Sequence, residues 1–290
     1  MEEIIKKADV LIEALPYIQR FRGKSVVIKY GGNLMENGNT FRSILLDIVL
    51  MSSVGMKPLL VHGGGNFITE RLTAEKKESK FANGLRITDA ETIKVVEEVL
   101  IGLNKRIVQQ IEELGGKAKG VLPEDKLFKA KKTFLEGIDL GFVGEVIGVK
   151  REILEKLLNQ DFIPVILPIG IGEDQKQYNL NADTAAAEIA TSISAEKLVF
   201  ITNVKGIMGN PEDAETLISV LTEEEAKTLI EEEVITEGML PKVKAAINSL
   251  KSGVKKVHIV DGRLSHSILL EIFTKEGIGT EILLKRAEAE

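Results

Sequence analysis

The sequence contains no cysteine. This absence excludes disulfides, thiolate metal sites and a cysteine nucleophile, and it weakly favours a reducing compartment, so we expect a cytoplasmic protein. The three histidines, His62, His258 and His266, lack the spacing of a zinc site, and we expect no metal bound by side chains. No apolar stretch approaches the roughly 18 residues of a membrane span, and the amphipathic start carries acidic residues early. We therefore expect neither secretion nor a membrane segment.

Aromatic residues and net positive charge are also lacking. Aromatic residues make up 4% of the chain, and the formal net charge is −6. Binding to a phosphate backbone needs a basic face, and binding to single strands needs aromatic stacking platforms. We therefore predict no general nucleic-acid surface, and any anionic ligand must be bound locally.

Short apolar runs alternate with helix-period segments along the 290 residues. Runs such as SVVIKY, KPLLVH and EKLVFITNV have the neighbours that βαβ units require, which predicts an α/β fold with helices on both faces of a mostly parallel sheet. The glycine-punctuated middle, from KLFKAKK to GFVGEVIGVK, predicts a β-ribbon instead. Capping boxes are predicted at two helix starts, Thr88 with Glu91 and Thr222 with Glu225. We place a boundary between two lobes near Tyr178.

Two of the apolar runs end in glycine clusters. VVIKYGGN places Lys29 and two glycines where one strand leaves the core, and PLLVHGGGN ends another strand in three glycines. A charged side chain is costly within an apolar sheet, so Lys29 should lie at the strand end beside freed backbone amides. Two such clusters favour anion binding over simple tight turns. Ile68 breaks the G-x-G-x-x-G spacing and the Walker pattern is missing, which disfavours a dinucleotide-dependent dehydrogenase.

Three further stretches place polar side chains where structure alone does not require them. FANGLRITD presents Arg86 before a helix start, either to a carboxylate or to solvent. YNLNAD places Asn179, Asn181 and Asp183 at the entry of an alanine-rich helix, where one N-cap suffices. GMLPKVK places Lys242 in a first helical turn, where the macrodipole disfavours a cation unless an anion lies there. A solvated lysine is the alternative reading of Lys242.

The ordered set of motifs resembles a known family. IKYGG, HGGG, GLRITD, YNLNADTAAAEIA, ITNVKGI and GMLPKVKAA together are similar to the motifs of the amino acid kinase family, and within it of the N-acetylglutamate kinases. The resemblance covers nearly the whole chain. It implies an αβα sandwich around a mostly parallel sheet of about eight strands, with an N-terminal helix in residues 1–20, a lobe in 21–178 that binds the acyl amino acid, and a lobe in 179–290 that binds ATP. Mg²⁺ would be held by the nucleotide.

The resemblance also implies a reaction and a set of roles. The γ-phosphoryl group of ATP would pass to the γ-carboxylate of N-acetyl-L-glutamate, a step of arginine biosynthesis. Lys29 and Lys242 would neutralise the transferring group, and Asp183 would orient them. The acceptor would be held by Gly64, Gly65, Arg86, Asn179 and Asn181. The nucleotide would be held by Gly31, Gly32, Asn203, Gly206 and Lys242.

Three residues depart from the family pattern. Asn203 stands where an aspartate is usual near the ribose and adenine, so one charge on the nucleotide side is missing. Glu237 replaces a glycine close to the expected position of ATP, where it would repel the phosphates or point outward. Asn66 replaces a proline after HGGG and is expected only to loosen the turn.

The two ends of the chain resemble the arginine-inhibited, hexameric members of the family. VLIEALPYIQRF is similar to the N-terminal helix that joins dimers into a ring, and HSILLEIFTKEGIGT is similar to their arginine-binding segment. On this resemblance L-arginine is an effector, the chain forms a dimer or a hexamer, and docking of a nitrogen-signalling regulator protein is left open. The effector contacts would be Tyr17, Lys197, His266, Glu271 and Gly277. The alternative is a packing helix and an ordinary αβ ending.

Two other functions compete with this one. The related kinase of lysine biosynthesis acts on an α-aminoadipate derivative bound to an acidic carrier protein, and it would need a basic rim that FANGLRITD does not obviously supply. A non-catalytic, arginine-binding regulatory paralogue would explain Asn203 and Glu237. The presence of Lys29, Asp183 and Lys242 argues against that paralogue.

Overall fold

The computed structural model describes residues 2–210, 213–236 and 238–286. Within these ranges the helices are α1 (Glu2–Phe21), α2 (Gly38–Ser53), α3 (Gly65–Ala74), α4 (Thr92–Glu113), α5 (Arg151–Asn159), α6 (Ala182–Ser192), α7 (Glu223–Glu231), α8 (Leu240–Lys251) and α9 (Ser267–Ile272). The strands of the main sheet are β1 (Ser25–Tyr30), β2 (Lys57–His62), β5 (Ala118–Val121), β8 (Ile163–Ile166), β11 (Lys197–Thr202), β12 (Val220–Thr222), β13 (Lys256–Asp261) and β14 (Thr280–Leu283).

The described residues form a sheet of eight strands in the order β12-β14-β13-β11-β1-β2-β8-β5. Every neighbouring pair runs parallel except β13 and β14. The predicted sheet is therefore confirmed in both size and direction. Strands β1 and β11 lie side by side in its centre, so the segments 21–178 and 179–290 contribute adjacent strands to one sheet.

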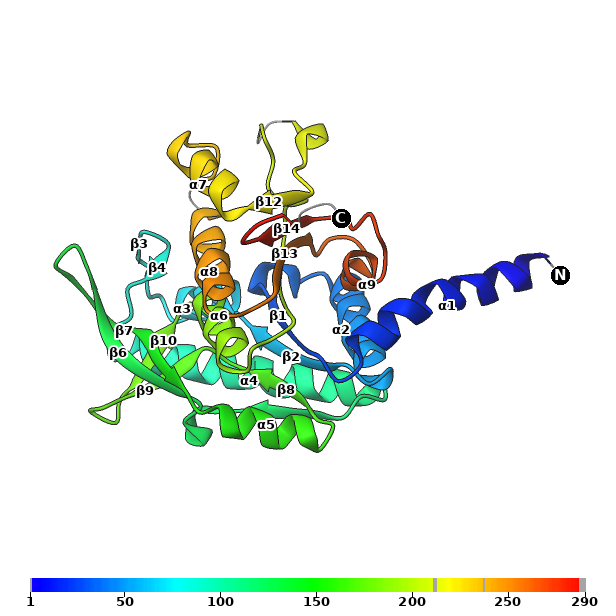
Figure 1. The fold of residues 1–290 in the computed structure, drawn as a ribbon. Coiled ribbons are helices and arrows are strands. Elements are labelled where there is room, and N and C mark those ends of the chain that lie inside the picture. The colour runs from blue at the N-terminus through cyan, green and yellow to red at the C-terminus, as the bar shows by residue number, and fades with distance from the viewer. Residues whose placement is uncertain (1, 211–212, 237, 287–290) are drawn as a thin grey trace.

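Helices cover both faces of the sheet, as a parallel sheet requires. In β1, Val26, Ile28 and Tyr30 belong to an apolar cluster shared with α2, α4 and α9. Val27 belongs to the opposite cluster, which contains residues of α5, α6 and α8. Side chains alternate along a strand, so Lys29 projects from the same face as Val27. The predicted αβα sandwich is confirmed. Helices α6 and α8 pack on the face that carries Val27 and Lys29, and they lie side by side (Figure 1).

A second group of strands lies beside the main sheet. The long strands β6 (Phe128–Leu135) and β7 (Ile138–Val149) form an antiparallel ribbon, which confirms the ribbon predicted for the middle of the chain. Strands β9 (Ile169–Gly172) and β10 (Gln177–Leu180) complete a four-stranded ring with them. A small hairpin, β3 (Phe81–Ala82) and β4 (Leu85–Arg86), stands near the ribbon (Figure 1).

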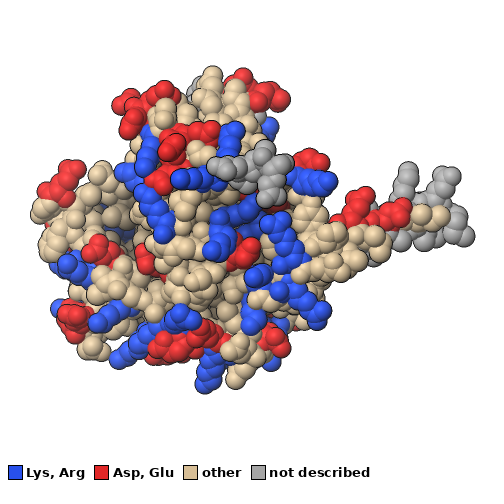
Figure 2. All heavy atoms as spheres, viewed as in Figure 1, with Lys and Arg blue, Asp and Glu red and all other residues tan. Residues whose placement is uncertain are grey.

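Helix α1 extends away from the body of the molecule in Figure 1. Near its C-terminal end the Tyr17 ring packs on Phe273, with 6.3 Å between ring centroids, whereas Ile5, Ile12 and Leu15 are exposed along its length. Among the residues that the structure describes, no helix is long and apolar enough to cross a membrane. Acidic and basic side chains are interspersed over the face of the molecule seen in Figure 2.

One of the two predicted capping boxes is confirmed and the other is wrong. Thr222 Oγ1 accepts from the Glu225 amide at 3.2 Å, and a Glu225 carboxylate oxygen accepts from the Thr222 amide at 2.8 Å. Thr88 caps no helix, because α4 begins four residues later and the Asp89 carboxylate accepts from the Thr92 amide at 2.7 Å. Thr88 is buried instead, and its hydroxyl donates to the Arg86 carbonyl.

The capping box of α7 gives a stability prediction. Thr222→Ala removes the acceptor for the Glu225 amide, and loss of such a cap costs about 1 kcal/mol. Thr228→Ala on the same helix is the matched control, because the Thr228 side chain is exposed and, among the described residues, its hydroxyl bonds only to the Glu224 carbonyl of its own helix. We expect urea unfolding to show a lower free energy of unfolding for Thr222→Ala alone. Equal stability of the two variants would contradict the assignment.

Candidate active site

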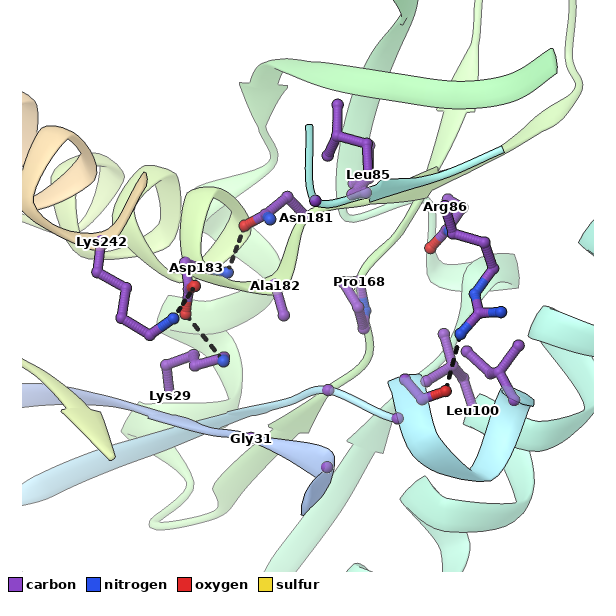
Figure 3. Close-up of a pocket in the computed structure, with 18 of the residues that line it drawn as sticks. Lys29, Gly31, Leu85, Arg86, Leu100, Pro168, Asn181, Ala182, Asp183 and Lys242 are labelled. Carbon is purple, nitrogen blue, oxygen red and sulfur yellow. Dashed lines mark hydrogen bonds and ion pairs between the residues drawn. The ribbon is translucent and has the colours of Figure 1, made fainter. Parts of the chain in front are cut away.

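A cavity of about 320 Å³ opens where β1, β2 and β11 end, the edge at which parallel sheets bind ligands. The close-up in Figure 3 shows that its lining comes from β1, α6, α8 and the loops after β1 and β2. The sequence-predicted residues that line it are Lys29, Gly31, Gly32, Gly64, Gly65, Arg86, Asn179, Asn181, Asp183, Asn203 and Lys242. Residues more than two hundred positions apart in the chain therefore meet in one place.

Two ammonium groups flank one carboxylate in this cavity. Lys29 Nζ lies 2.9 Å from Asp183 Oδ1, and Lys242 Nζ lies 3.0 Å from Asp183 Oδ2 (Figure 3). Burial opposes the charged form of Asp183, but the two ammonium groups outweigh it and hold the pKa of this carboxyl below its ordinary value. The site thus keeps one negative and two positive charges at neutral pH.

Local sequence explains how the three charges are positioned. Lys29 is the penultimate residue of β1, and Asp183 is the second residue of α6, where the helix macrodipole favours a carboxylate. Asn181 is the N-cap of α6, and its side-chain oxygen accepts from the amides of Asp183 and Thr184 at 2.9 and 3.1 Å. Lys242 lies in the first turn of α8, as predicted, and the Asp183 carboxylate offsets the unfavourable macrodipole there.

The two glycine loops touch each other beneath the cavity. The Gly63 amide donates to the Tyr30 carbonyl at 2.9 Å, and a Cβ added to Gly32 would lie 3.2 Å from Gly64 Cα. Helix α3 starts directly after Gly64, so its free N-terminal amides face the same region. The two glycine loops and the N-terminus of α3 thus line the same cavity as the paired lysines, which suits a polyanionic ligand.

Arg86 is buried, so the alternative of a surface arginine is wrong. Its guanidinium donates to Ser79 Oγ at 2.6 Å and to both the Gly65 carbonyl and Thr69 Oγ1 at 2.8 Å. The Phe81 ring lies 4.6 Å from the guanidinium carbon.

Sequence reasoning did not identify these supports of Arg86. A signal for the hairpin was present, because Asn-Gly between two short apolar segments is typical of a tight hairpin turn. Both Asn83 and Gly84 have positive φ, 44° and 77°, as that turn requires.

The remaining predicted contacts differ in their placement. Asn179 Nδ2 lies 3.4 Å from Thr88 Oγ1 and also lines the cavity, and Asn203 follows the end of β11 at its rim. Gly206 does not line the cavity, because it packs against Thr280 on β14. Its role toward a nucleotide stays a prediction. Glu237 lies outside the described residues.

Within the described part of the chain, no three histidine or acidic side chains converge to hold a metal ion. Asp183, the acidic residue of the cavity, is already paired with two lysines.

A separate buried network joins three of the five residues predicted to bind arginine. Lys197 Nζ donates to His258 Nε2 at 2.8 Å, and His258 Nδ1 donates to Glu271 Oε1 at 2.6 Å. Burial and the nearby Lys197 charge lower the pKa of His258, consistent with a neutral ring. Gly277 approaches Glu271, since an added Cβ would lie 3.0 Å from its carboxylate.

The other two residues predicted to bind arginine do not join the His258 network by side-chain hydrogen bonds in the structure. His266 Nδ1 lies 2.6 Å from Asp47 Oδ1, and Tyr17 packs on Phe273. The interpretation of His258 as a packing residue is confirmed, because it is buried and bonded at both nitrogens.

The sequence of this chain is similar to those of known proteins. The model of the family described as "Amino acid kinase family" matches residues 24–261. An acetylglutamate kinase of Caldanaerobacter subterraneus subsp. tengcongensis is 51% identical over 280 residues, which cover 96% of this chain and 93% of that protein.

Solved structures show the same fold. N-acetylglutamate synthase of Neisseria gonorrhoeae, complexed with coenzyme A and N-acetyl-glutamate, superposes with a TM-score of 0.87 at 29% identity and covers 97% of this chain. The chain spans 64% of that synthase. The same enzyme complexed with coenzyme A and L-arginine superposes with a TM-score of 0.80 at 26% identity, over 96% of this chain and 65% of that one.

The paired charges give a prediction about pH. Because the folded pKa of Asp183 is lowered, its contribution to stability is fully present above the ordinary value of 3.8 and is lost as the pH falls through the folded pKa. Asp183→Asn should therefore cost about 3 kcal/mol at pH 7, since it leaves the buried Lys29 and the half-buried Lys242 without their partner. Below pH 3.8 the difference from the wild type should shrink.

Urea unfolding at pH 7 and pH 3 measures this difference. Asp161→Asn makes the same chemical change at an exposed position and should leave the stability unchanged at both values. A deficit of Asp183→Asn that is the same at pH 7 and pH 3 would contradict the electrostatic explanation.

Proposed function

The chain belongs to the amino acid kinase family, and we propose that it transfers the γ-phosphoryl group of ATP to the γ-carboxylate of N-acetyl-L-glutamate. One observation carries the proposal. Lys29, Asp183 and Lys242 form a charged cluster in the cavity that the two glycine loops line. The chain that carries this cluster is 51% identical to an acetylglutamate kinase over nearly its whole length. The cluster supplies what phosphoryl transfer requires, which is positioning and neutralisation of negative charge.

The reaction needs no general base from the protein. A carboxylate oxygen of the acceptor attacks the γ-phosphorus, the bond from that phosphorus to the β,γ-bridging oxygen breaks, and ADP leaves with the electron pair. The products are an acyl phosphate and ADP. A glutamate-type carboxylate has an ordinary pKa of about 4.3 and is already ionised at neutral pH, so no proton has to be removed.

The charged cluster acts on this transfer electrostatically. Lys29 and Lys242 reduce the repulsion between the anionic acceptor and the phosphates, and both lie within 3.0 Å of Asp183. Asp183 holds the two ammonium groups in fixed positions, so they need not reorganise during the reaction. Such preorganised charges are worth more in a partly desolvated cavity than in water.

The acceptor and the nucleotide would each be bound by a different set of residues. Arg86 would bind the α-carboxylate of the acceptor with the N–H groups that Ser79, Gly65 and Thr69 leave free, and Asn179, Asn181 and the amides of Gly64 and Gly65 would contact the rest. Gly31, Gly32, Asn203 and Gly206 would hold the nucleotide. Segments 21–178 and 179–290 would thus be the acceptor and nucleotide lobes. Mg²⁺ bound to the phosphates would neutralise part of their charge.

We also propose L-arginine as an effector and a homo-oligomer as the assembly, either a dimer or a hexamer. Two observations support this. Lys197 and Glu271, which His258 links, carry charges of opposite sign, as binding of an amino acid requires, and Lys197 Nζ lies 5.2 Å from the ring of Phe21 in α1. The exposed apolar residues of α1 would be covered in an oligomer. The effector site would then lie beside the C-terminal end of α1, the same helix that would take part in assembly.

The function is tested by ADP release with Mg²⁺, ATP and free N-acetyl-L-glutamate, with the product trapped as a hydroxamate. The proposal expects ADP and hydroxamate in equal amounts, both dependent on the acceptor. Turnover only with a carrier-bound α-aminoadipate derivative would instead assign the chain to lysine biosynthesis. A folded protein without turnover on either acceptor would indicate the regulatory paralogue.

Lys242 gives a sharp test of the catalytic cluster. Lys242→Ala should lower kcat by about 10²–10³-fold, as removal of one preorganised electrostatic group does in other enzymes. Lys244 lies two positions further along the same helix and is exposed, so Lys244→Ala should leave kcat unchanged. Steady-state kinetics of both variants decide the matter, and equal kcat values for Lys242→Ala and the wild type would remove Lys242 from the mechanism.

Arginine binding is tested without activity. Saturating L-arginine should raise the melting temperature, because a ligand that binds only the folded state stabilises it. Lys197→Met should abolish the rise, and L-lysine serves as the control ligand. A melting temperature that L-arginine does not move would contradict the effector proposal and leave the kinase untouched.

A further inference from the structure

His62 is a buried, titratable residue that the reaction itself does not use. It ends β2 directly before the second glycine loop, and its side chain is fully buried. Its Nδ1 lies 3.0 Å from the Gly63 carbonyl oxygen, and its Nε2 lies 3.2 Å from Asn104 Nδ2. A carbonyl oxygen can only accept, so Nδ1 carries the proton and Nε2 accepts from the Asn104 amide.

Asn104 reaches His62 from helix α4. Its amide nitrogen donates both to His62 and to the Val165 carbonyl on β8, at 2.9 Å. Leu100 and Leu103 lie on the same helical face and touch the loop, because a Cβ added to Gly64 would lie 2.7 Å from Leu100 and 3.0 Å from Leu103. One face of α4 therefore supports the second glycine loop with both apolar and polar side chains.

This support lies on the face of the sheet opposite the lysines. Tyr30 and His62 are paired in register on β1 and β2, and Tyr30 belongs to the α2 and α4 face. Lys29 precedes Tyr30 and projects from the other face. The Tyr30 hydroxyl donates to the Leu34 carbonyl across the first glycine loop at 3.1 Å. Each glycine loop is thus tied from below by the last side chain of the strand before it.

The bond from His62 determines which way one peptide faces. The carbonyl of Gly63 and the N–H of Gly64 belong to the same planar, trans peptide, so they point in opposite directions. Because His62 holds the carbonyl on the buried side, the Gly64 N–H points toward the cavity that Gly64 lines. Within the described residues the structure provides no acceptor for that N–H. Glycine tolerates a flipped peptide, which would aim a carbonyl oxygen at the anionic substrate instead.

We propose that His62 and Asn104 are positioning residues, which hold the Gly63–Gly64 peptide with its N–H toward the anionic substrate. The inference deepens the proposed function and rests on it for the identity of that substrate. Burial lowers the pKa of His62 to about 4, so the ring stays neutral, and keeps one donor and one acceptor, at neutral pH. Asn104 favours the tautomer with the proton on Nδ1, because its amide donates a hydrogen bond to Nε2.

A matched pair of variants separates positioning from bulk packing. His62→Asn places an amide nitrogen near the position of Nδ1 and keeps the bond to the Gly63 carbonyl. His62→Gln places its amide near Nε2, toward Asn104, and loses that bond. We expect His62→Asn to retain kcat within about threefold, and His62→Gln to lose about 10–100-fold in kcat, somewhat less than the loss of a full oxyanion donor. The KM for ATP should be unchanged in both.

Structure determination of the wild type and both variants supplies the readout that does not depend on activity. The Gly63–Gly64 peptide should be flipped or disordered in His62→Gln and native in His62→Asn. A native peptide in His62→Gln, or equal losses of kcat in the two variants, would overturn the positioning role. If the wild type itself does not phosphorylate acetylglutamate, the proposed function fails, and the peptide orientation still decides this inference.

Discussion

Two ammonium groups share one partly buried cavity because a carboxylate lies between them. Lys29 and Lys242 come from different layers of the fold, and each lies within 3.0 Å of Asp183. Removing charges from water is costly, and burying two like charges together is more so unless an opposite charge compensates. The position of α6 against β1 and α8 therefore has an electrostatic requirement as well as an apolar one. The cluster carries one negative and two positive charges, so it can accept a second negatively charged group, which a transferring phosphoryl group would supply.

Because side chains alternate along β1 and β2, the two faces of the sheet contribute different groups to the site. On one face, Lys29 meets the charges carried by α6 and α8. On the other face, Tyr30 and His62 hold the backbone of the glycine loops from below. Glycine loops expose amides but do not fix them, because glycine adopts many conformations. Buried polar side chains that hydrogen-bond to the loops restrict their conformation. Because Tyr30 and His62 are neutral, they do not compete with the lysines for the anion.

Much of the site could be predicted from local sequence, because strand ends, glycine clusters and helix starts are local features. Lys29, Asp183 and Lys242 each stood out as a charged residue at the end of an apolar element. The supports of Arg86 and the role of Asn104 could not be predicted in this way, since they depend on contacts between segments distant in sequence. The cap assigned to Thr88 failed for a related reason. Thr88 pairs with Gly141 on the distant strand β7, and the Asp89 carboxylate accepts from the first amide of α4 instead.

The central claim is that the aspartate and the lysines act as one electrostatic unit. A double-mutant cycle on kcat tests it most directly, with Asp183→Asn, Lys242→Ala and the double variant compared with the wild type. If Asp183 acts by holding Lys242, the double variant should lose little more kcat than the worse single variant, because residues that act as a unit are strongly non-additive. Losses that simply multiply would show two independent contributions and would contradict the account.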